Sequence, residues 1–362
     1  MLGAGNGGCA AAADLTDRGY AVRLYNRSRR RLDPLIERGG ISMVGIRTVF
    51  APVALITGDL RQAVEGADLI MLAVPVSAHP YYAAALAELL EPEQVVFLNP
   101  GHMGGGLFVV AEIHRRTGRT DVRTCEVTTL SYVCRMADEG TVNVLQTVSN
   151  LSFAAFPGRH QSGLFDAMRR VYPDLVEASS VLETGFLDIN AVEHPPQTVC
   201  NAGWVERTRG QYLFYYEGTT PAVGRVIDAV DRERMAIAAA ANVPTRPFVE
   251  TFFRTGYTTE SAMRTGSAYA ALQASEPNRW IKGPPSLDHR YLHEDVGFAL
   301  VPWSQMGRAL GVPTPTIDTL IALASMLNGI DYRSEGLTLE RLGLAGRDLR
   351  ALGDFLERGP GG

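Results

Sequence analysis

The sequence predicts an α/β domain followed by an all-helical domain, and three observations lead to this fold class. Strand-like apolar runs alternate with helix-like segments in the first half of the chain, which is the pattern of a doubly wound sheet. Strand signals almost vanish beyond residue 180, where helix-like segments follow one another. A chain of 362 residues is also too long for one ordinary core. We therefore expect two domains, at residues 1–178 and 179–362.

Short apolar runs mark the strands of the first domain. Residues 67–74 form an almost uninterrupted run, which is typical of a strand buried on both faces. Helices are expected between the strands, at residues 10–18 and 78–90. The further strands are expected at residues 21–25, 94–98, 121–127, 141–147 and 151–156.

The second domain is expected to consist of helices. Residues 220–242 have a strongly helical composition, and Pro221 suits the first turn of a helix. Residues 275–288 hold three prolines and a glycine and therefore predict a loop. The other helices are expected at residues 247–255, 261–274, 294–310 and 316–327.

The composition argues against several classes of partner. The net charge is −5 without a long basic run, whereas phosphate binding by nucleic-acid-binding proteins needs clustered Lys and Arg. No apolar stretch approaches the length of a membrane span, and no signal peptide is evident, so a cytoplasmic location is expected. The cysteines lack metal-ligand spacing, so we expect no metal and buried free thiols at Cys9, Cys125, Cys134 and Cys200.

The chain opens on the glycine loop Gly-Ala-Gly-Asn-Gly-Gly, which matches the G-x-G-x-x-G pattern of Rossmann-type dinucleotide-binding domains. Gly3 permits the tight turn, Gly5 lets the backbone approach a pyrophosphate, and Gly8 lets the following helix pack closely. The N-terminus of that helix favours an anion. The pattern also requires a strand before Gly3, where the sequence has only Met1 and Leu2. The residues of this loop expected to bind the cofactor are Gly3, Gly5, Asn6, Gly7 and Gly8.

The end of the second expected strand favours NADP(H), although NAD(H) stays open. An acidic residue at this place would bind the ribose hydroxyl of NAD, whereas an arginine favours a 2′-phosphate. The run Asn26-Arg27-Ser28 contains no carboxylate, and none appears until Asp33. Arg27 can stack on adenine and, together with Ser28, can bind the phosphate. The competing interpretation is a solvated basic start of a helix.

Two later turns are expected to meet the cofactor, because ligands bind at the carboxyl ends of strands in open α/β sheets. The first turn contains Val74 and Pro75, and the second contains Pro100 and Gly101. Four glycines lie within residues 101–106, which indicates either backbone close to a ligand or a flexible surface turn.

His194 is the favoured acid–base residue among the seven histidines. It precedes two prolines that are expected to break a helix, and a ring held at such a junction beside an interdomain cleft can exchange protons near neutral pH. A carboxylate is needed to hold the imidazole. Asp295 is the candidate, and the spacing alone does not select it over Glu193 or Asp188.

These segments together resemble the opine dehydrogenases, which include octopine, nopaline and carboxyethyl-amino-acid dehydrogenases. The resemblance implies a Rossmann domain joined to a helical substrate domain, with His194 and Asp295 as the catalytic pair. It also implies NAD(P)H-dependent reductive condensation of an amino acid with a 2-oxo acid through an imine. The matching pieces span nearly the whole chain: GAGNGG at residues 3–8, NPG at 99–101, VEHPP at 192–196, YEGTTPAVGR at 216–225, EDVGFALVP at 294–302 and TLERLGL at 338–344.

The resemblance also carries an expectation for the substrate site. Val127 and Ser131 depart from the family pattern, which often has Thr and Pro at these places. The substrate-binding residues that the resemblance implies are Glu126, Thr128, Asn201, Thr219 and Thr220, with Tyr216 and Glu217 nearby. Substrate carboxylates need cationic or amide partners, and the candidates among which the sequence does not choose are Arg135, Asn201, Arg207, Arg209 and Arg264.

Two other functions are weighed. A 2-keto acid reductase of the ketopantoate or glycerol-3-phosphate dehydrogenase type has a similar architecture but uses a lysine acid, and Lys282 lies in a Pro-Gly loop. A dinucleotide-binding protein without catalysis is the third interpretation. The apolar face formed by Leu342, Leu349, Leu352 and Leu356 fits either a core contact or a homodimer contact, with core the favoured interpretation.

Overall fold

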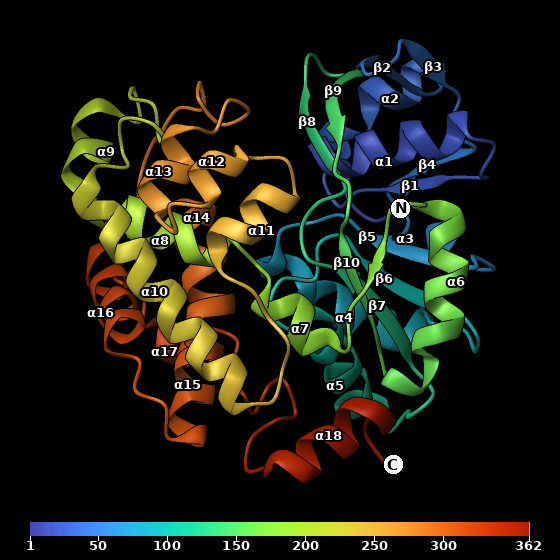
Figure 1. Cartoon of the computed structure of the whole chain (residues 1–362). Coiled ribbons are helices and arrows are strands. Elements are labelled where there is room, and N and C mark those ends of the chain that lie inside the picture. The colour runs from blue at the N-terminus through green and yellow to red at the C-terminus, as the bar shows by residue number, and fades with distance from the viewer. Residues whose placement is uncertain (362) are drawn as a thin grey trace. The chain divides into compact units, whose positions relative to one another are not determined.

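A computed structural model describes residues 1–361 (Figure 1). The chain forms two compact units, one of residues Met1–Val181 and the other of residues Leu182–Leu352. The C-terminal residues from Gly353 onward return to the first unit, whereas the sequence analysis placed all of 179–362 in the second domain. Phe355 explains the difference, because its ring packs 5.4 Å from the ring of Phe156 in the core of the first unit.

The first unit is built on one long sheet, which confirms the α/β fold class. Five strands follow the order β11-β10-β7-β6-β5, and β1 pairs with β4. All pairs are parallel except β7 with β10. The strands are β1 (Arg23–Tyr25), β4 (Leu55–Thr57), β5 (Leu69–Leu72), β6 (Val95–Leu98), β7 (Arg123–Val127), β10 (Ser152–Phe156) and β11 (Val176–Glu177).

Leu2 occupies the position of the strand that the glycine-loop pattern requires. It forms parallel bridges to Tyr25 of β1 and to Leu72 of β5, and so joins the two parts of the sheet. Its amide donates to the Met71 carbonyl at 2.7 Å, and the amide of Gly3 donates to the Tyr25 carbonyl at 2.8 Å. Leu2 therefore leads the chain from the middle of the sheet into the loop.

Helices cover both faces of this sheet (Figure 1). One apolar cluster joins the buried Ala10–Ala13 row of α1 with Met168 of α6 and with sheet residues such as Phe97. The small alanines let α1 lie close to the strands, which is the arrangement that a dinucleotide-binding helix requires. The helices of this unit are α1 (Asn6–Asp17), α2 (Asp33–Arg38), α3 (Leu60–Val64), α4 (His79–Leu89), α5 (Gly105–Thr117) and α6 (Gln161–Val171), together with most of α18 (Leu349–Arg358).

A second, four-stranded sheet packs on α1. Its order is β3-β2-β9-β8, and only β9 coincides with an expected strand, which the sequence analysis treated as part of the main sheet. The inward side chains Met43, Val142 and Val144 are fully buried. The strands are β2 (Ile41–Gly45), β3 (Val49–Ala51), β8 (Tyr132–Met136) and β9 (Thr141–Thr147).

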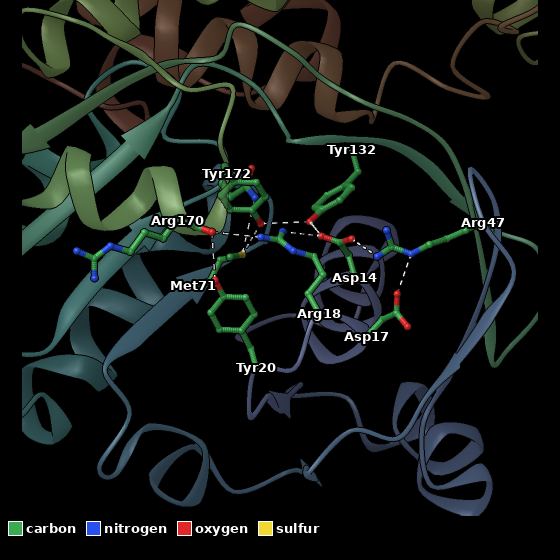
Figure 2. Close-up of polar contacts among 10 residues, drawn as sticks. Asp14, Asp17, Arg18, Tyr20, Arg47, Met71, Tyr132, Arg170 and Tyr172 are labelled. Carbon is green, nitrogen blue, oxygen red and sulfur yellow. Dashed lines mark hydrogen bonds and ion pairs between the residues drawn. The ribbon is translucent and has the colours of Figure 1, made fainter.

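The buried carboxylate of Asp14 links α1 to this second sheet, as Figure 2 shows. The Tyr132 hydroxyl of β8 donates to it at 2.8 Å, and Arg47, from the turn after β2, forms an ion pair with it. Arg18 adds a third contact at 3.3 Å, and Arg47 also pairs with Asp17 at 2.9 Å. A buried charge is tolerated only when it is paired and hydrogen-bonded, so this network fixes α1 against the sheet.

The second unit is all-helical, as the sequence predicts. The expected helix at 220–242 is α10, whereas the expected helix at 261–274 is two helices separated by Gly266 at φ +69°. No helix among residues 1–361 is long and apolar enough to cross a membrane. The helices are α7 (Val181–Phe186), α8 (Asn190–Cys200), α9 (Ala202–Thr208), α10 (Pro221–Ala240), α11 (Phe248–Arg254), α12 (Glu260–Met263), α13 (Ala268–Gln273), α14 (Arg290–His293), a π-helical turn (Val296–Leu300), α15 (Val301–Leu310), α16 (Pro315–Asn328) and α17 (Tyr332–Glu335).

Arg234 is the buried centre of this helical unit. Only 1% of the residue is exposed, and its guanidinium pairs with Asp231 and donates to the carbonyls of Phe186 and Arg246. It therefore ties α10 to the end of α7 and to the segment before α11. Three of the four cysteines are buried as expected, whereas Cys200 is exposed.

Tyr132→Phe should lower the free energy of unfolding by about 1.5–3 kcal/mol, because it removes a buried hydrogen bond to a charged group. Tyr20→Phe is the matched control, since the exposed Tyr20 hydroxyl donates only to the Arg170 carbonyl at 3.2 Å. Chemical denaturation of both variants measures the difference. Equal losses in the two variants would contradict the structural role given to the Asp14 network.

Candidate active site

The glycine loop is a tightly packed backbone cradle in the first unit. A Cβ atom on Gly8 would lie 1.7 Å from the Gly3 carbonyl oxygen, so no larger residue fits there. Gly3 itself has φ +110° and packs against Val74. Among the described residues, no side chain caps α1, and no acidic residue lies in its first turn. These features suit the pyrophosphate of a dinucleotide, which binds at a helix N-terminus.

Two asparagines brace this loop through their side chains. Asn26 accepts the Ala4 amide at 3.1 Å and donates to the Ser28 carbonyl at 3.1 Å. Asn6 accepts the Met136 amide at 3.0 Å, which anchors the start of α1 to β8. The structure thus brings Asn26 and the glycine loop together, and it shows that both asparagine side chains already have protein partners.

The end of β1 carries an arginine beside two tyrosines. The guanidinium carbon of Arg27 lies 5.2 Å from the ring centre of Tyr81, whose hydroxyl is 3.1 Å from the hydroxyl of Tyr25. Arg31 extends toward the glycine loop, with Nη1 3.9 Å from the position of a Cβ on Gly5. Sequence reasoning missed both Tyr81 and Arg31, because neither follows from the glycine pattern.

The second glycine-rich turn is buried, which excludes a flexible surface turn. A Cβ atom on Gly101 would lie 2.5 Å from the carboxyl carbon of Glu126. The Gly106 amide, in the first turn of α5, donates to Glu126 Oε2 at 2.8 Å. Glu126 therefore faces the N-terminus of α5, where a negative charge is favoured. Thr128 lies two residues further along and is also buried.

Ser131, one of the two departures noted in the sequence, makes two hydrogen bonds through groups that a proline lacks. Its amide and its hydroxyl both donate to Asn99 Oδ1, at 3.0 and 3.1 Å. A proline at this position would have neither donor. The turn before Gly101 is therefore held here by contacts that the usual family residue does not offer.

His194 lies in the second unit, on α8, and one structural expectation about it was wrong. Helix α8 runs from Asn190 to Cys200 with Pro195 and Pro196 inside it, so the prolines do not break it. A proline removes one helical N–H donor but has a backbone φ that suits a helix. Both prolines are buried, and the packing of α8 in the core keeps the helix continuous.

The imidazole of His194 is held on both nitrogens. Nδ1 lies 2.8 Å from Asp295 Oδ2, and Nε2 lies 2.7 Å from the Tyr215 hydroxyl. The ring of Tyr291 stacks on the imidazole with centres 3.9 Å apart. The structure thus pairs His194 with Asp295, whereas Glu193 lies 4.0 Å from Nε2. Sequence reasoning missed Tyr215, which stands 21 positions along the chain from His194.

Asp295 directly precedes the π-helical turn Val296–Leu300. A π-helical turn is rare and often occurs at functional sites. Asp295 and His194 are both buried, and they stand 101 positions apart in the sequence.

Glu193 is a second buried carboxyl beside the imidazole. Burial raises its pKa well above the usual value, and the charges of Asp295 and Asp188 act in the same direction. Its Oε2 has no hydrogen-bond partner among the described residues. The neutral acid is therefore the favoured form of Glu193 in the folded protein.

The other expected substrate residues are Asn201, which lies between α8 and α9, and Thr219 and Thr220, which lie on the turn before α10. Asn201 donates to the carbonyls of Gln197 and Gly218 at 2.7 and 2.8 Å. Thr219 accepts the Gln197 side chain at 2.6 Å, and Thr220 caps α10. These polar groups hold the turn to α8. Among the expected carboxylate partners, Arg264 forms an exposed ion pair with Glu260, and Arg135 donates to the Cys134 carbonyl.

Both the N-terminal part and the helical part of the chain match families of known proteins. Residues 177–328 match the family model for the α-helical domain of NAD/NADP octopine/nopaline dehydrogenase, and residues 1–116 match the N-terminus of NAD-dependent glycerol-3-phosphate dehydrogenase. An opine dehydrogenase of Arthrobacter sp. (strain 1C) is 37% identical over 347 residues, which are 96% of this chain and 95% of that protein.

Solved structures share the fold at low sequence identity. Octopine dehydrogenase with NADH and L-arginine has a TM-score of 0.77 at 21% identity, covering 97% of this chain and 96% of that one. Yersinopine dehydrogenase with NADP⁺ has a TM-score of 0.76 at 18% identity, covering 99% and 97%.

Glu193→Gln should change how stability depends on pH. The pKa of Glu193 is raised in the folded protein. Above a pH of about 4.3 the folded protein therefore keeps a proton on Glu193 that the unfolded chain releases. The wild-type protein therefore loses this contribution as pH rises, whereas the glutamine variant does not. Melting temperatures measured from pH 5 to pH 8, a range of about three units, should fall more steeply for the wild type. Parallel curves would mean that Glu193 is ionised in the fold.

Proposed function

The chain belongs to the opine dehydrogenase family, and on that premise we propose that it catalyses NADPH-dependent reductive condensation of an amino acid with a 2-oxo acid. The family consists of NAD(P)-dependent oxidoreductases that act on a CH–NH bond. The observation that carries the proposal is the buried hydrogen bond between His194 Nδ1 and Asp295 at 2.8 Å. It supplies the acid–base pair that imine formation needs and that a passive dinucleotide-binding protein does not need.

The chemistry requires a group that takes a proton and later returns it. The amino group must lose a proton before it attacks the ketone, and the resulting hydroxyl must gain one to leave as water. Imidazole exchanges protons near neutral pH, and the Asp295 carboxylate stabilises the imidazolium. When the nicotinamide is bound, it supplies the hydride that reduces the imine carbon. We assign the acid–base role to His194 and the orienting role to Asp295.

The cofactor cradle fits a dinucleotide because Gly3 and Gly8 leave no room for a Cβ atom, and among the described residues nothing lies closer than Arg31 Nη1 at 3.9 Å to a Cβ on Gly5. Residues Gly3, Gly5 and Gly8 bring the backbone to the pyrophosphate, and Arg27 with Ser28 supplies donors for a 2′-phosphate. The carboxylate of Asp33 is paired with Arg29 at 2.8 Å instead of facing a ribose. This arrangement favours NADPH over NADH. The yersinopine dehydrogenase neighbour carries NADP⁺, and the octopine dehydrogenase neighbour carries NADH.

The substrates are inferred from chemistry and from the relatives. An octopine dehydrogenase structure contains NADH and pyruvate, and another contains NADH and L-arginine. An amino acid with a 2-oxo acid such as pyruvate is therefore the pair to test first. In this chain we assign substrate contacts to Glu126, Thr128, Asn201, Thr219 and Thr220.

The test is NADPH consumption with pyruvate and a panel of amino acids. Wild-type protein should oxidise NADPH only when both substrates are present. His194→Asn should lower kcat at least about 100-fold, because acid–base groups contribute factors of this size. His114→Asn is the control, since His114 lies on α5 and its Nδ1 is bonded to the Arg119 carbonyl at 2.9 Å. Turnover with the 2-oxo acid alone would indicate a keto acid reductase, and NADPH binding without turnover would indicate a non-catalytic protein.

Arg27→Ala should weaken NADPH selectively. We expect kcat/KM for NADPH to fall roughly 10-fold or more while the value for NADH changes little, because only NADPH has the phosphate that this arginine binds. Arg29→Ala is the matched control, since the exposed Arg29 is paired with Asp33. Steady-state kinetics with both cofactors measure the ratio. An equal fall for NADH would assign Arg27 to adenine stacking rather than to the phosphate.

A further inference from the structure

The Tyr215 hydroxyl is hydrogen-bonded to Nε2 of His194, the nitrogen through which protons would be exchanged. The Tyr215 hydroxyl lies 2.7 Å from Nε2, and Tyr215 itself is 6% exposed. On the other side of the ring, Nδ1 faces the carboxylate of Asp295 at 2.8 Å. A proton that leaves or reaches the imidazole through Nε2 must therefore pass through the Tyr215 hydroxyl, or Tyr215 must first move away.

The partners of His194 fix the direction of each hydrogen bond. An ionised carboxylate only accepts hydrogen bonds, so Nδ1 of the neutral ring carries the proton and donates to Asp295. Nε2 then has a free lone pair, and the Tyr215 O–H donates to it. The chain of bonds runs from Tyr215 through His194 to Asp295. This is the arrangement in which His194 is ready to accept a proton from Tyr215.

We propose that Tyr215 relays protons between His194 and the reacting amine. This inference rests on the proposed function. In the first step the substrate ammonium gives a proton to the Tyr215 oxygen while the Tyr215 proton moves to Nε2. The products are a neutral amine, a neutral Tyr215 and an imidazolium beside Asp295.

The return step uses the same path in reverse. After the amine has added to the ketone, Nε2 gives its proton to the Tyr215 oxygen, and Tyr215 gives its own proton to the carbinolamine hydroxyl. The C–O bond breaks, water leaves, and the nitrogen lone pair forms the C=N bond. Protons and electrons balance without another reactant, and the same two residues serve both steps.

The surroundings keep Tyr215 in its neutral form. Burial raises the pKa of the Tyr215 phenol well above its usual value, and neighbouring Tyr291 acts in the same direction. A hydrogen bond with Tyr291 also raises this pKa, whereas the charge of Arg290 opposes the increase. A neutral phenol can both donate and accept, which a relay requires. The charged and titratable groups around this cluster include Asp188 just before α8, Glu193 and His194 from α8, Tyr257, His289 just before α14, Arg290 and Tyr291 from α14, and Asp295.

The structure offers a matched control in the same segment. Tyr212 is also buried, and its ring stacks on Trp204 with centres 4.2 Å apart. Its hydroxyl has no hydrogen-bond partner among the described residues. Tyr212→Phe therefore removes a buried hydroxyl without touching the bonds of His194.

The first experiment compares Tyr215→Phe with Tyr212→Phe in the full chain with bound NADPH. Tyr215→Phe should lower kcat about 100-fold, within the range of acid–base groups, with little change in KM, and the loss of its buried hydrogen bond should also lower the melting temperature. It should also alter the solvent isotope effect on kcat. Tyr212→Phe should leave kcat and the solvent isotope effect at their wild-type values. Wild-type kcat in Tyr215→Phe would show that Tyr215 moves aside, and equal losses in both variants would show a structural role; either result overturns the relay.

A second experiment keeps the hydroxyl and the shape of the side chain, in case Tyr215→Phe does not fold. Fluorinated tyrosines of graded acidity are incorporated at position 215. If the phenol transfers protons, kcat should vary monotonically with its acidity, as Brønsted behaviour requires. The same kcat for every analogue overturns the relay.

The two proposals fail in different ways. Absence of NADPH oxidation by the wild-type enzyme with every substrate pair overturns the proposed function and the relay together. An active wild-type enzyme whose Tyr215 variants keep full kcat overturns the relay alone.

Discussion

The hydrogen bond between His194 and Asp295 is the interaction on which the helical unit depends for chemistry. It joins α8 to the start of a π-helical turn, and both partners are buried. Loss of one partner would leave the other buried polar group unsatisfied, which typically costs about 1–3 kcal/mol and more for a charged group. The pair can therefore form only if α8 stays helical through Pro195 and Pro196 and the turn at Asp295 keeps its register.

The cofactor cradle in the first unit depends on a different constraint, which is the close approach of backbones. Gly8 must lack a side chain so that α1 can pack against Gly3, and the alanine row of α1 serves the same purpose along the helix. Asp14 then holds the far part of α1 against the second sheet through Tyr132 and Arg47. The two units thus solve their tasks in opposite ways. One removes side chains to admit a ligand, and the other buries polar side chains to hold an acid–base pair.

The sequence predicted the features that depend on local patterns. Strand periodicity gave the α/β class, the glycine spacing gave the cofactor cradle, and helical composition gave α10. Spacing alone could not separate Asp295 from Glu193 and Asp188, because the pairing spans 101 positions and depends on tertiary packing; only the family resemblance singled out Asp295. The second sheet and the continuity of α8 were missed for the same reason. Short strands such as β3 have weak patterns, and two consecutive prolines favour a break unless core packing opposes it.

The charges around the imidazole bear on how His194 would perform the proposed acid–base role beside several buried carboxyl groups. If Glu193 and Asp295 were both ionised, two negative charges would hold the imidazolium and make its proton hard to return. Burial and the nearby charges raise the pKa of Glu193, so the neutral acid is its favoured form. One carboxylate then balances one imidazolium when the proton arrives. The same burial that makes Glu193 costly to ionise would therefore keep the proposed proton transfer at His194 reversible.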